Sequence, residues 1–167
     1  DSPLAAARKI QWIGTPVCTW NGSMQFDGRI VHIKGGVEFK GKMHGAEGRW
    51  WYVQSNSKHL NIFMDAPVDM HAPSEEDIAI DRLELDGSVV VHAIEYDQTG
   101  EKLNYAVIDV PTLTVHAKTN QVIGDGPGSI HSYNQIAKTR IGSDTKRPAA
   151  PISGSHLVFR DHVVGFL

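Results

Sequence analysis

Residues 20–43 read WNGSMQFDGRIVHIKGGVEFKGKM. Short apolar runs in this stretch are separated by Asn-Gly, Asp-Gly and Gly-Gly dipeptides, which supply the positive φ angles that tight turns between strands require. Within it, Val37, Phe39 and Met43 interleave with charged residues at a period close to two. That period is typical of a strand with one buried face and one wetter face. The stretch therefore predicts antiparallel strands joined by turns.

The same pattern continues through most of the chain. Leu103, Tyr105 and Val107 alternate with smaller or polar residues, and further turn signals stand at 86–87 and 97–100. The best helical candidate, residues 75–85, fits strand alternation equally well, so we favour strand there. The predicted strands are 17–20, 23–27, 29–34, 37–43, 50–54, 60–64, 78–85, 88–96, 103–110, 112–117, 122–124 and 129–133.

Many short strands with closely spaced turns predict an all-β chain, built as an antiparallel β-jelly-roll or folded-sheet sandwich that is partly open at its edges. We expect one domain over residues 1–138. Residues 139–155 are rich in Gly, Pro, Ser and basic residues, which predicts a flexible loop or linker. Residues 156–167 are strand-like again and have the pattern of the start of a further unit.

Composition excludes several classes of protein. The 167 residues carry 16 Lys and Arg against 19 Asp and Glu, for a net charge of -3, which argues against a nucleic-acid partner because such partners require a clustered basic face. No window approaches the roughly 20 apolar residues of a transmembrane helix. The single cysteine, Cys18, excludes an internal disulfide and any multi-cysteine metal site.

Histidine is abundant, with nine residues, so a metal site has to be considered. No pair has the short helical spacing of a zinc hydrolase, but ligands can converge from separate strands. Residues 26–32 and 85–92 share an apolar residue, Asp-Gly, an apolar run and a histidine, which indicates either a repeated hairpin unit or coincidence. A repeat would bring His32 beside His92; otherwise the histidines are hydrogen-bonded or solvated strand residues. The nine are His32, His44, His59, His71, His92, His116, His131, His156 and His162.

The remaining motifs do not predict catalysis. The glycine-rich run at 124–129 lacks the Lys and the following helix of a phosphate-binding loop, so it predicts a tight corner between strands. Ser155 lacks the Gly-x-Ser-x-Gly elbow of a hydrolase, and Cys18 has the surroundings of a small buried hydrophobe. Adjacent Trp50 and Trp51 on a strand must point to opposite faces, so one of them is core and the other is solvent-facing or covered by a partner.

Several of these segments together resemble a known family. Residues 20–39 contain Phe26-Asp27-Gly28 followed by an apolar run and Gly-Gly-Val, and residues 96–100 form the turn Tyr-Asp-Gln-Thr-Gly. With the segment 119–128, these residues resemble the unit of OstA-like proteins. That family comprises the organic-solvent-tolerance and lipopolysaccharide-transport β-jelly-roll domains of Gram-negative envelopes. The resemblance spans residues 20–133.

The resemblance implies a V-shaped, partly open jelly roll whose apolar interior accepts acyl chains and whose edge strands pair with neighbours. It implies a non-enzymatic protein of the periplasm or cell envelope of a Gram-negative bacterium, without a cofactor, that binds or bridges lipid or protein. The implied partners are a lipopolysaccharide-like amphiphile and an edge-strand protein, including a second copy of the chain. The residues implied to line the ligand site are Met24, Phe26, Val37, Phe39, Leu103, Tyr105, Leu113 and Val115.

Two alternatives remain open at this point. The same eight apolar side chains could form a closed core, which would make the chain a structural or interaction repeat module. The histidines could instead build a small β-jelly-roll metalloenzyme.

Overall fold

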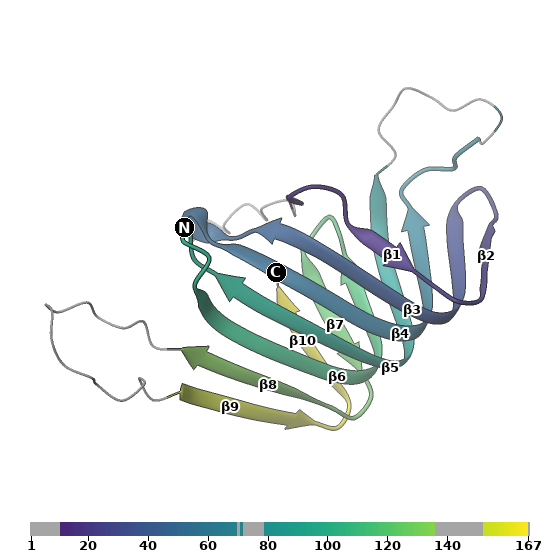
Figure 1. Ribbon diagram of the computed structural model, residues 1–167. Helices are drawn as coiled ribbons and strands as arrows, with labels where there is room; N and C mark the ends of the chain where they lie inside the picture. The colour runs from purple at the N-terminus through teal and green to yellow at the C-terminus, as the bar shows by residue number, and fades with distance from the viewer. Residues whose placement is uncertain (1–10, 70, 72–78, 136–151, 167) are drawn as a thin grey trace, which may run out of the picture.

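The computed structural model describes residues 11–69, 71, 79–135 and 152–166, and within them the chain forms one antiparallel sheet of ten strands (Figure 1). The other element in these ranges is the short 3-10 helix η1, Ala46–Gly48, between β3 and β4. No helix among the described residues is long and apolar enough to cross a membrane. The strands are β1 (Val17–Thr19), β2 (Ser23–Phe26), β3 (Ile30–His44), β4 (Trp50–Met64), β5 (Ile80–Tyr96), β6 (Lys102–His116), β7 (Gln121–Asp125), β8 (Gly128–Gln135), β9 (Ile152–Phe159) and β10 (His162–Phe166).

The strands of the sheet lie in seven rows, which we call tracks. Each track runs antiparallel to its neighbours. Four tracks are the long strands β3 to β6, which lie side by side in chain order. The other three tracks are each made of two short strands: β1 and β2 both pair with β3, β7 and β8 both pair with β6, and β10 and β9 pair with β7 and β8. The order of the tracks in space is therefore their order in the chain.

Every track except β6 is interrupted along one line, which we call the crease. The ladders shift register between Lys34 and Val37, between Asn56 and His59, and between Asp86 and Val89. The two-strand tracks break at the same level, at residues 20–22, 126–127 and 160–161. The sheet bends at the crease into two wings (Figure 1). The first wing holds β2, β7, β10 and the adjoining halves of β3 to β6; the second wing holds β1, β8, β9 and the other halves.

The residues at the crease explain the bend. Gly35 and Gly36 have φ values of +94° and +64°, and Gly87 has a φ of +84°, a region that glycine enters without steric cost. Bulges with such residues bend a strand and increase its twist. In β6, Pro111 stands opposite the bulge of β5, where it has no backbone N–H to contribute to a ladder.

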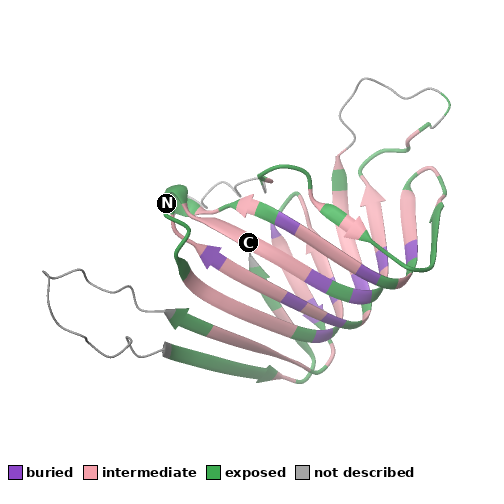
Figure 2. Cartoon of the chain, in the orientation of Figure 1, coloured by how far each residue is buried: buried purple, intermediate pink, exposed green. Residues whose placement is uncertain are grey.

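The hydrophobic core follows the crease and joins the two wings. Figure 2 shows a band of buried positions that crosses the long strands where the sheet turns. We call the face that carries this core the inner face. Farther from the crease, inner-face side chains such as Val53, Ile62 and Leu83 are only half-buried. The buried apolar residues of the described chain all lie within a few positions of the crease: Ile33, Val37, Leu60, Leu85, Val89, Val91, Val110 and Leu113.

The predicted fold class is confirmed: the chain is an all-β, antiparallel folded sheet of the sandwich type, open at its edges. The strand boundaries differ in one respect. Residues 29–34 and 37–43 were predicted as two strands but form the single strand β3, and the same holds for the pairs that make up β4, β5 and β6. The Gly-Gly dipeptide at 35–36 and the Asp-Gly dipeptide at 86–87 lie at bulges, where the chain continues in its direction and does not reverse.

The two similar segments, 26–32 and 85–92, have different places in the fold. Asp27-Gly28 forms the turn between β2 and β3, whereas Asp86-Gly87 forms the bulge inside β5. The similarity reflects a shared need for a positive φ angle, +96° at Gly28 and +84° at Gly87. Of the predicted linker, residues 139–151 lie outside the described residues and 152–155 begin β9; the segment 156–166 pairs within the same sheet.

Candidate binding surfaces

Six of the eight side chains that the resemblance assigned to a ligand site stand on the inner face. Met24 and Phe26 of β2 lie opposite Ile33 and Val31 of β3, which contact or form the core. The other four alternate in phase with core residues on β3 and β6: Val37, Phe39, Leu113 and Val115.

The other two do not join them. Tyr105 lies in register with Ile94 and stacks on His92 and Tyr133, with ring centroids 6.0 Å apart in both cases, on the outer face of the second wing. Its hydroxyl lies 2.7 Å from Nδ1 of His92. Leu103 stands at a register shift near the start of β6, beside Lys102.

The inner face is closed at the crease and half-open away from it. Val37 and Leu113 are buried within the core cluster, so their side chains are covered by protein. Phe26, Phe39 and Val115 are half-buried, and Met24 at the margin of the sheet is exposed. Any apolar ligand on this face would therefore contact the outer parts of the wings and not the crease.

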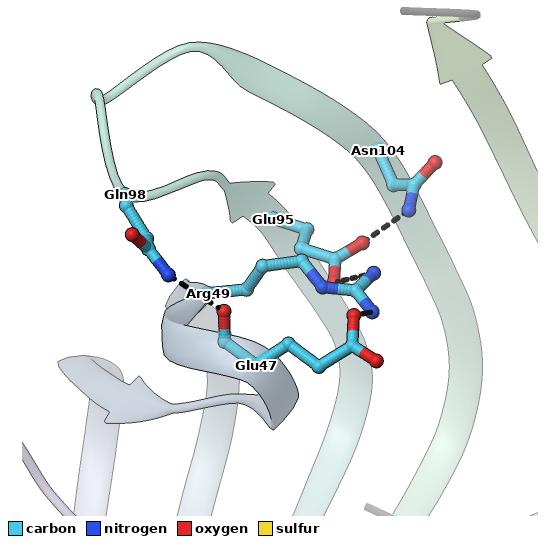
Figure 3. Close-up of polar contacts among 5 residues, drawn as sticks. All are labelled: Glu47, Arg49, Glu95, Gln98 and Asn104. Carbon is cyan, nitrogen blue, oxygen red and sulfur yellow. Dashed lines mark hydrogen bonds and ion pairs between the residues drawn. The ribbon is translucent and has the colours of Figure 1, made fainter.

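A polar cluster stands on the inner face of the second wing, at the end of β5 (Figure 3). Nη1 of Arg49, just after η1, donates to Oε1 of Glu95 over 3.1 Å, and its Nη2 donates to Oε2 of Glu47 over 3.1 Å. The side-chain amide of Asn104 donates to the second carboxylate oxygen of Glu95, and that of Gln98 donates to the main-chain oxygen of Glu47 over 3.0 Å. The cluster ties the β3–β4 loop to β5, to β6 and to the turn between them.

The sequence contains a signal for this cluster that our motif analysis missed. Glu95 is in phase with Val89, Val91 and Ala93, the inner-face residues of β5. A carboxylate at an apolar position of a strand requires a cation or several donors, because burial of an unpaired charge is very costly. Its cation, Arg49, is 46 residues away in the chain, so the partner could not be identified from local spacing.

The histidines do not converge. His32 contacts Asn61 and Asp27 in the first wing, whereas His92 contacts Tyr105 in the second. In the part of the chain that the structure describes, no group of three or more His, Cys, Asp or Glu side chains could hold a metal ion. The closest imidazole pair, His131 and His156, lies on neighbouring strands of the second wing.

The remaining candidate motifs have structural surroundings. The glycine-rich segment forms the corner at residues 126–127 between β7 and β8, as predicted, and Gly126 has a φ of +91°. Burial raises the pKa of the Cys18 thiol, which packs against the core from β1, as expected for a small hydrophobe.

The two adjacent tryptophans point to opposite faces of β4. Trp50 stacks on Tyr96 at a ring-centroid distance of 4.2 Å, and Nζ of Lys42 lies 5.2 Å from its ring. Trp51, in register with Glu95, belongs to the inner face. The outer tryptophan is therefore covered by neighbours of its own sheet.

The margins of the sheet are the most unusual surface. The four marginal strands β1, β2, β9 and β10 have the sequences VCT, SMQF, ISGSHLVF and HVVGF, without a single Lys, Arg, Asp or Glu. Six of the nine exposed large hydrophobic residues of the described chain lie on or beside these strands: Val17, Trp20, Met24, Leu157, Val158 and Val164.

The chain matches no protein-family model, no curated protein and no solved structure.

Proposed function

We propose that the chain is a non-enzymatic β-sheet protein of a Gram-negative cell envelope that bridges partners through its two open margins. A single observation supports bridging: both margins expose strands that carry no Lys, Arg, Asp or Glu and are unpaired on one side among the described residues. Natural sheets usually protect such margins with charges, prolines or covering elements, because an open edge recruits other strands. The partner that fits is a β-strand of another chain, added by main-chain hydrogen bonds.

The two margins favour a head-to-tail arrangement of copies. Met24, on the β1–β2 margin, is 53% exposed, and Val158, on the β9–β10 margin, is 66% exposed. Each margin offers apolar side chains that would be buried when the opposite margin of a second copy pairs with it. A contact between two different surfaces generates open chains of subunits rather than closed dimers.

Two charge substitutions test this arrangement. Met24→Lys places a charge on the β1–β2 margin, and Val158→Lys places one on the β9–β10 margin. Each variant leaves the other margin unchanged. We expect sedimentation velocity to show concentration-dependent association of the wild type, no association of either variant alone, and heterodimers when the two variants are mixed. Ile80→Lys, at an exposed apolar position of the interior strand β5, is the matched control and should associate as the wild type does.

Other outcomes contradict the proposal. A wild type that stays monomeric across the concentration series would exclude bridging by self-association. Association of Met24→Lys alone would mean that the two β9–β10 margins pair with each other, and the head-to-tail arrangement would be wrong.

The proposal extends to a lipid or lipopolysaccharide-like amphiphile on the inner face of the wings, where Phe26 and Phe39 are half-buried. Native mass spectrometry after exposure to lipopolysaccharide should then detect a retained adduct. Its absence would favour the closed-core structural module, an alternative that the burial of Val37 and Leu113 at the crease supports for that part of the inner face.

A further inference from the structure

We propose that His131 and His156 form a surface site for one divalent transition-metal ion, with Cu²⁺ preferred, that links β8 to β9. The two residues are direct partners in the antiparallel ladder, although 25 residues separate them in the chain. Their imidazole rings stack with centroids 3.9 Å apart and planes inclined by 15°. The outer face of the second wing thus holds two nitrogen ligands side by side on a pair of hydrogen-bonded strands.

The spacing suits a shared ion. A metal–imidazole bond is about 2.0–2.1 Å long, so two nitrogens bound to one ion are at most about 4.2 Å apart. Centroids 3.9 Å apart place the two rings close enough for one nitrogen of each to reach the same ion after one ring has left the stack. Stacked rings direct their in-plane lone pairs side by side, so one ring has to turn; His156 is exposed and has the freedom to do so.

The chemistry of the pair selects the ion. Neutral imidazole binds Cu²⁺, Ni²⁺ and Zn²⁺, with Cu²⁺ the strongest of the divalent series, whereas Ca²⁺ and Mg²⁺ require oxygen ligands. No third His, Cys, Asp or Glu joins the two imidazoles among the described residues, so water completes the coordination. The site is therefore an exchangeable surface site, and its effect is to clip the marginal strand β9 to the sheet.

The test uses the full chain without an affinity tag, in a Cys18→Ser background, because a thiol competes for the same ions. We expect Cu²⁺ titration to give one equivalent bound, and electron paramagnetic resonance to show two equatorial nitrogen ligands. His131→Gln and His156→Gln should each remove one nitrogen and weaken binding at least about tenfold, since loss of even an outer-shell partner typically costs 10- to 100-fold in metal affinity.

The matched control is His44→Gln, an exposed histidine of β3 on the same outer face, in register with Trp50 and far from the pair in the ladder order. It should bind Cu²⁺ as the background protein does. Circular dichroism of each variant without metal checks that the sheet is intact. As a second readout, Cu²⁺ should raise the Tm of the background protein and not that of the double variant His131→Gln/His156→Gln.

Three results would overturn the site: no bound equivalent of Cu²⁺ in the background protein, an unchanged nitrogen count after either substitution of the pair, or equal weakening by His44→Gln.

Discussion

The guanidinium of Arg49 lies 3.1 Å from the carboxylate of Glu95, and the two side chains differ in exposure, at 35% and 7%. The same guanidinium also contacts Glu47, whose side chain is 82% exposed, over 3.1 Å. One cation thus serves a carboxylate that water barely reaches and another that water surrounds. The first carboxylate depends on Arg49, because removal of the guanidinium leaves Oε1 of this buried group without that hydrogen bond, while Asn104 still donates to the other oxygen.

The two ion pairs of Arg49 should therefore differ in their contribution to stability. We expect Arg49→Met to lower the free energy of unfolding by about 1–3 kcal/mol, the penalty of leaving a buried group unsatisfied. Glu47→Gln removes only the exposed pair and should cost less than about 1 kcal/mol. Urea denaturation measures both, and equal losses would contradict the assigned burial of Glu95.

Substitution of Gly87, which lies at the crease, by a residue with a side chain should destabilise the folded sheet. A Cβ added at Gly87 would lie 2.7 Å from Cβ of Lys58, and the substituted residue would keep a backbone φ of +84°. At Gly100, with a φ of +85°, a Cβ would meet nothing within 4 Å, so Gly100→Ala reports the backbone strain alone. We expect Gly100→Ala to cost about 1–2 kcal/mol and Gly87→Ala to cost more, measured by urea denaturation. A smaller effect at Gly87 would show that the bulge adapts to a side chain.

Acid should remove the contribution of Asp97 to stability. Its carboxylate accepts hydrogen bonds from Oγ1 of Thr99 over 2.7 Å and from the amides of Thr99 and Glu101 over 2.8 Å. The Thr99 hydroxyl first, and then the Glu101 amide, hold the pKa of Asp97 below its ordinary value of 3.8. Since the folded state keeps this group ionised to lower pH than the unfolded chain, its stabilisation is present above the ordinary pKa and is lost as pH falls through the folded pKa.

Thermal unfolding of Asp97→Ala against the wild type checks this sign. The difference in Tm should be largest at neutral pH and should shrink as the pH falls below the ordinary pKa of 3.8. A difference that stays constant over this range would mean that the turn does not depend on the ionised carboxylate.

The core at the crease should carry most of the packing energy. We expect Leu85→Ala, at a buried position of the core cluster, to lower the free energy of unfolding by about 2–5 kcal/mol. Val158→Ala, on the exposed margin, should stay within about 0.5 kcal/mol of the wild type. Comparable losses at the two positions would place the core elsewhere than along the crease.

Alternation was sufficient to predict the class of fold and most strand positions. Val37 and Phe39 share a face in the sheet as their spacing predicts, and Trp50 and Trp51 point to opposite sides. What spacing could not distinguish is a turn from a bulge, because both need positive φ angles. Gly28 lies in a turn between two strands, whereas Gly87 bends a single strand. The difference depends on which strands pair with the residues before and after each glycine, and that pairing is a property of the whole sheet.

The candidate site was less predictable for a related reason. The resemblance implied one shared lining for Met24, Phe26, Phe39 and Tyr105, but Tyr105 stands on the outer face although its local alternation is the same. Alternation identifies residues that share a face and does not say which face is inside. The pairs Arg49–Glu95 and His131–His156 join positions far apart in the chain, so only the register of the strands brings them together.

The seven tracks succeed one another in space in the order in which the chain makes them. Each track after the first is therefore laid against one that precedes it in the chain, and none of the described strands has to be threaded between two others. The topology of the sheet therefore sets no fixed number of tracks. Deletion of the last track, β9 and β10, would leave β8 and β7 as the new margin of the sheet, with the same hydrogen-bonding pattern. Insertion of a further hairpin would widen the sheet without rearrangement of the other strands.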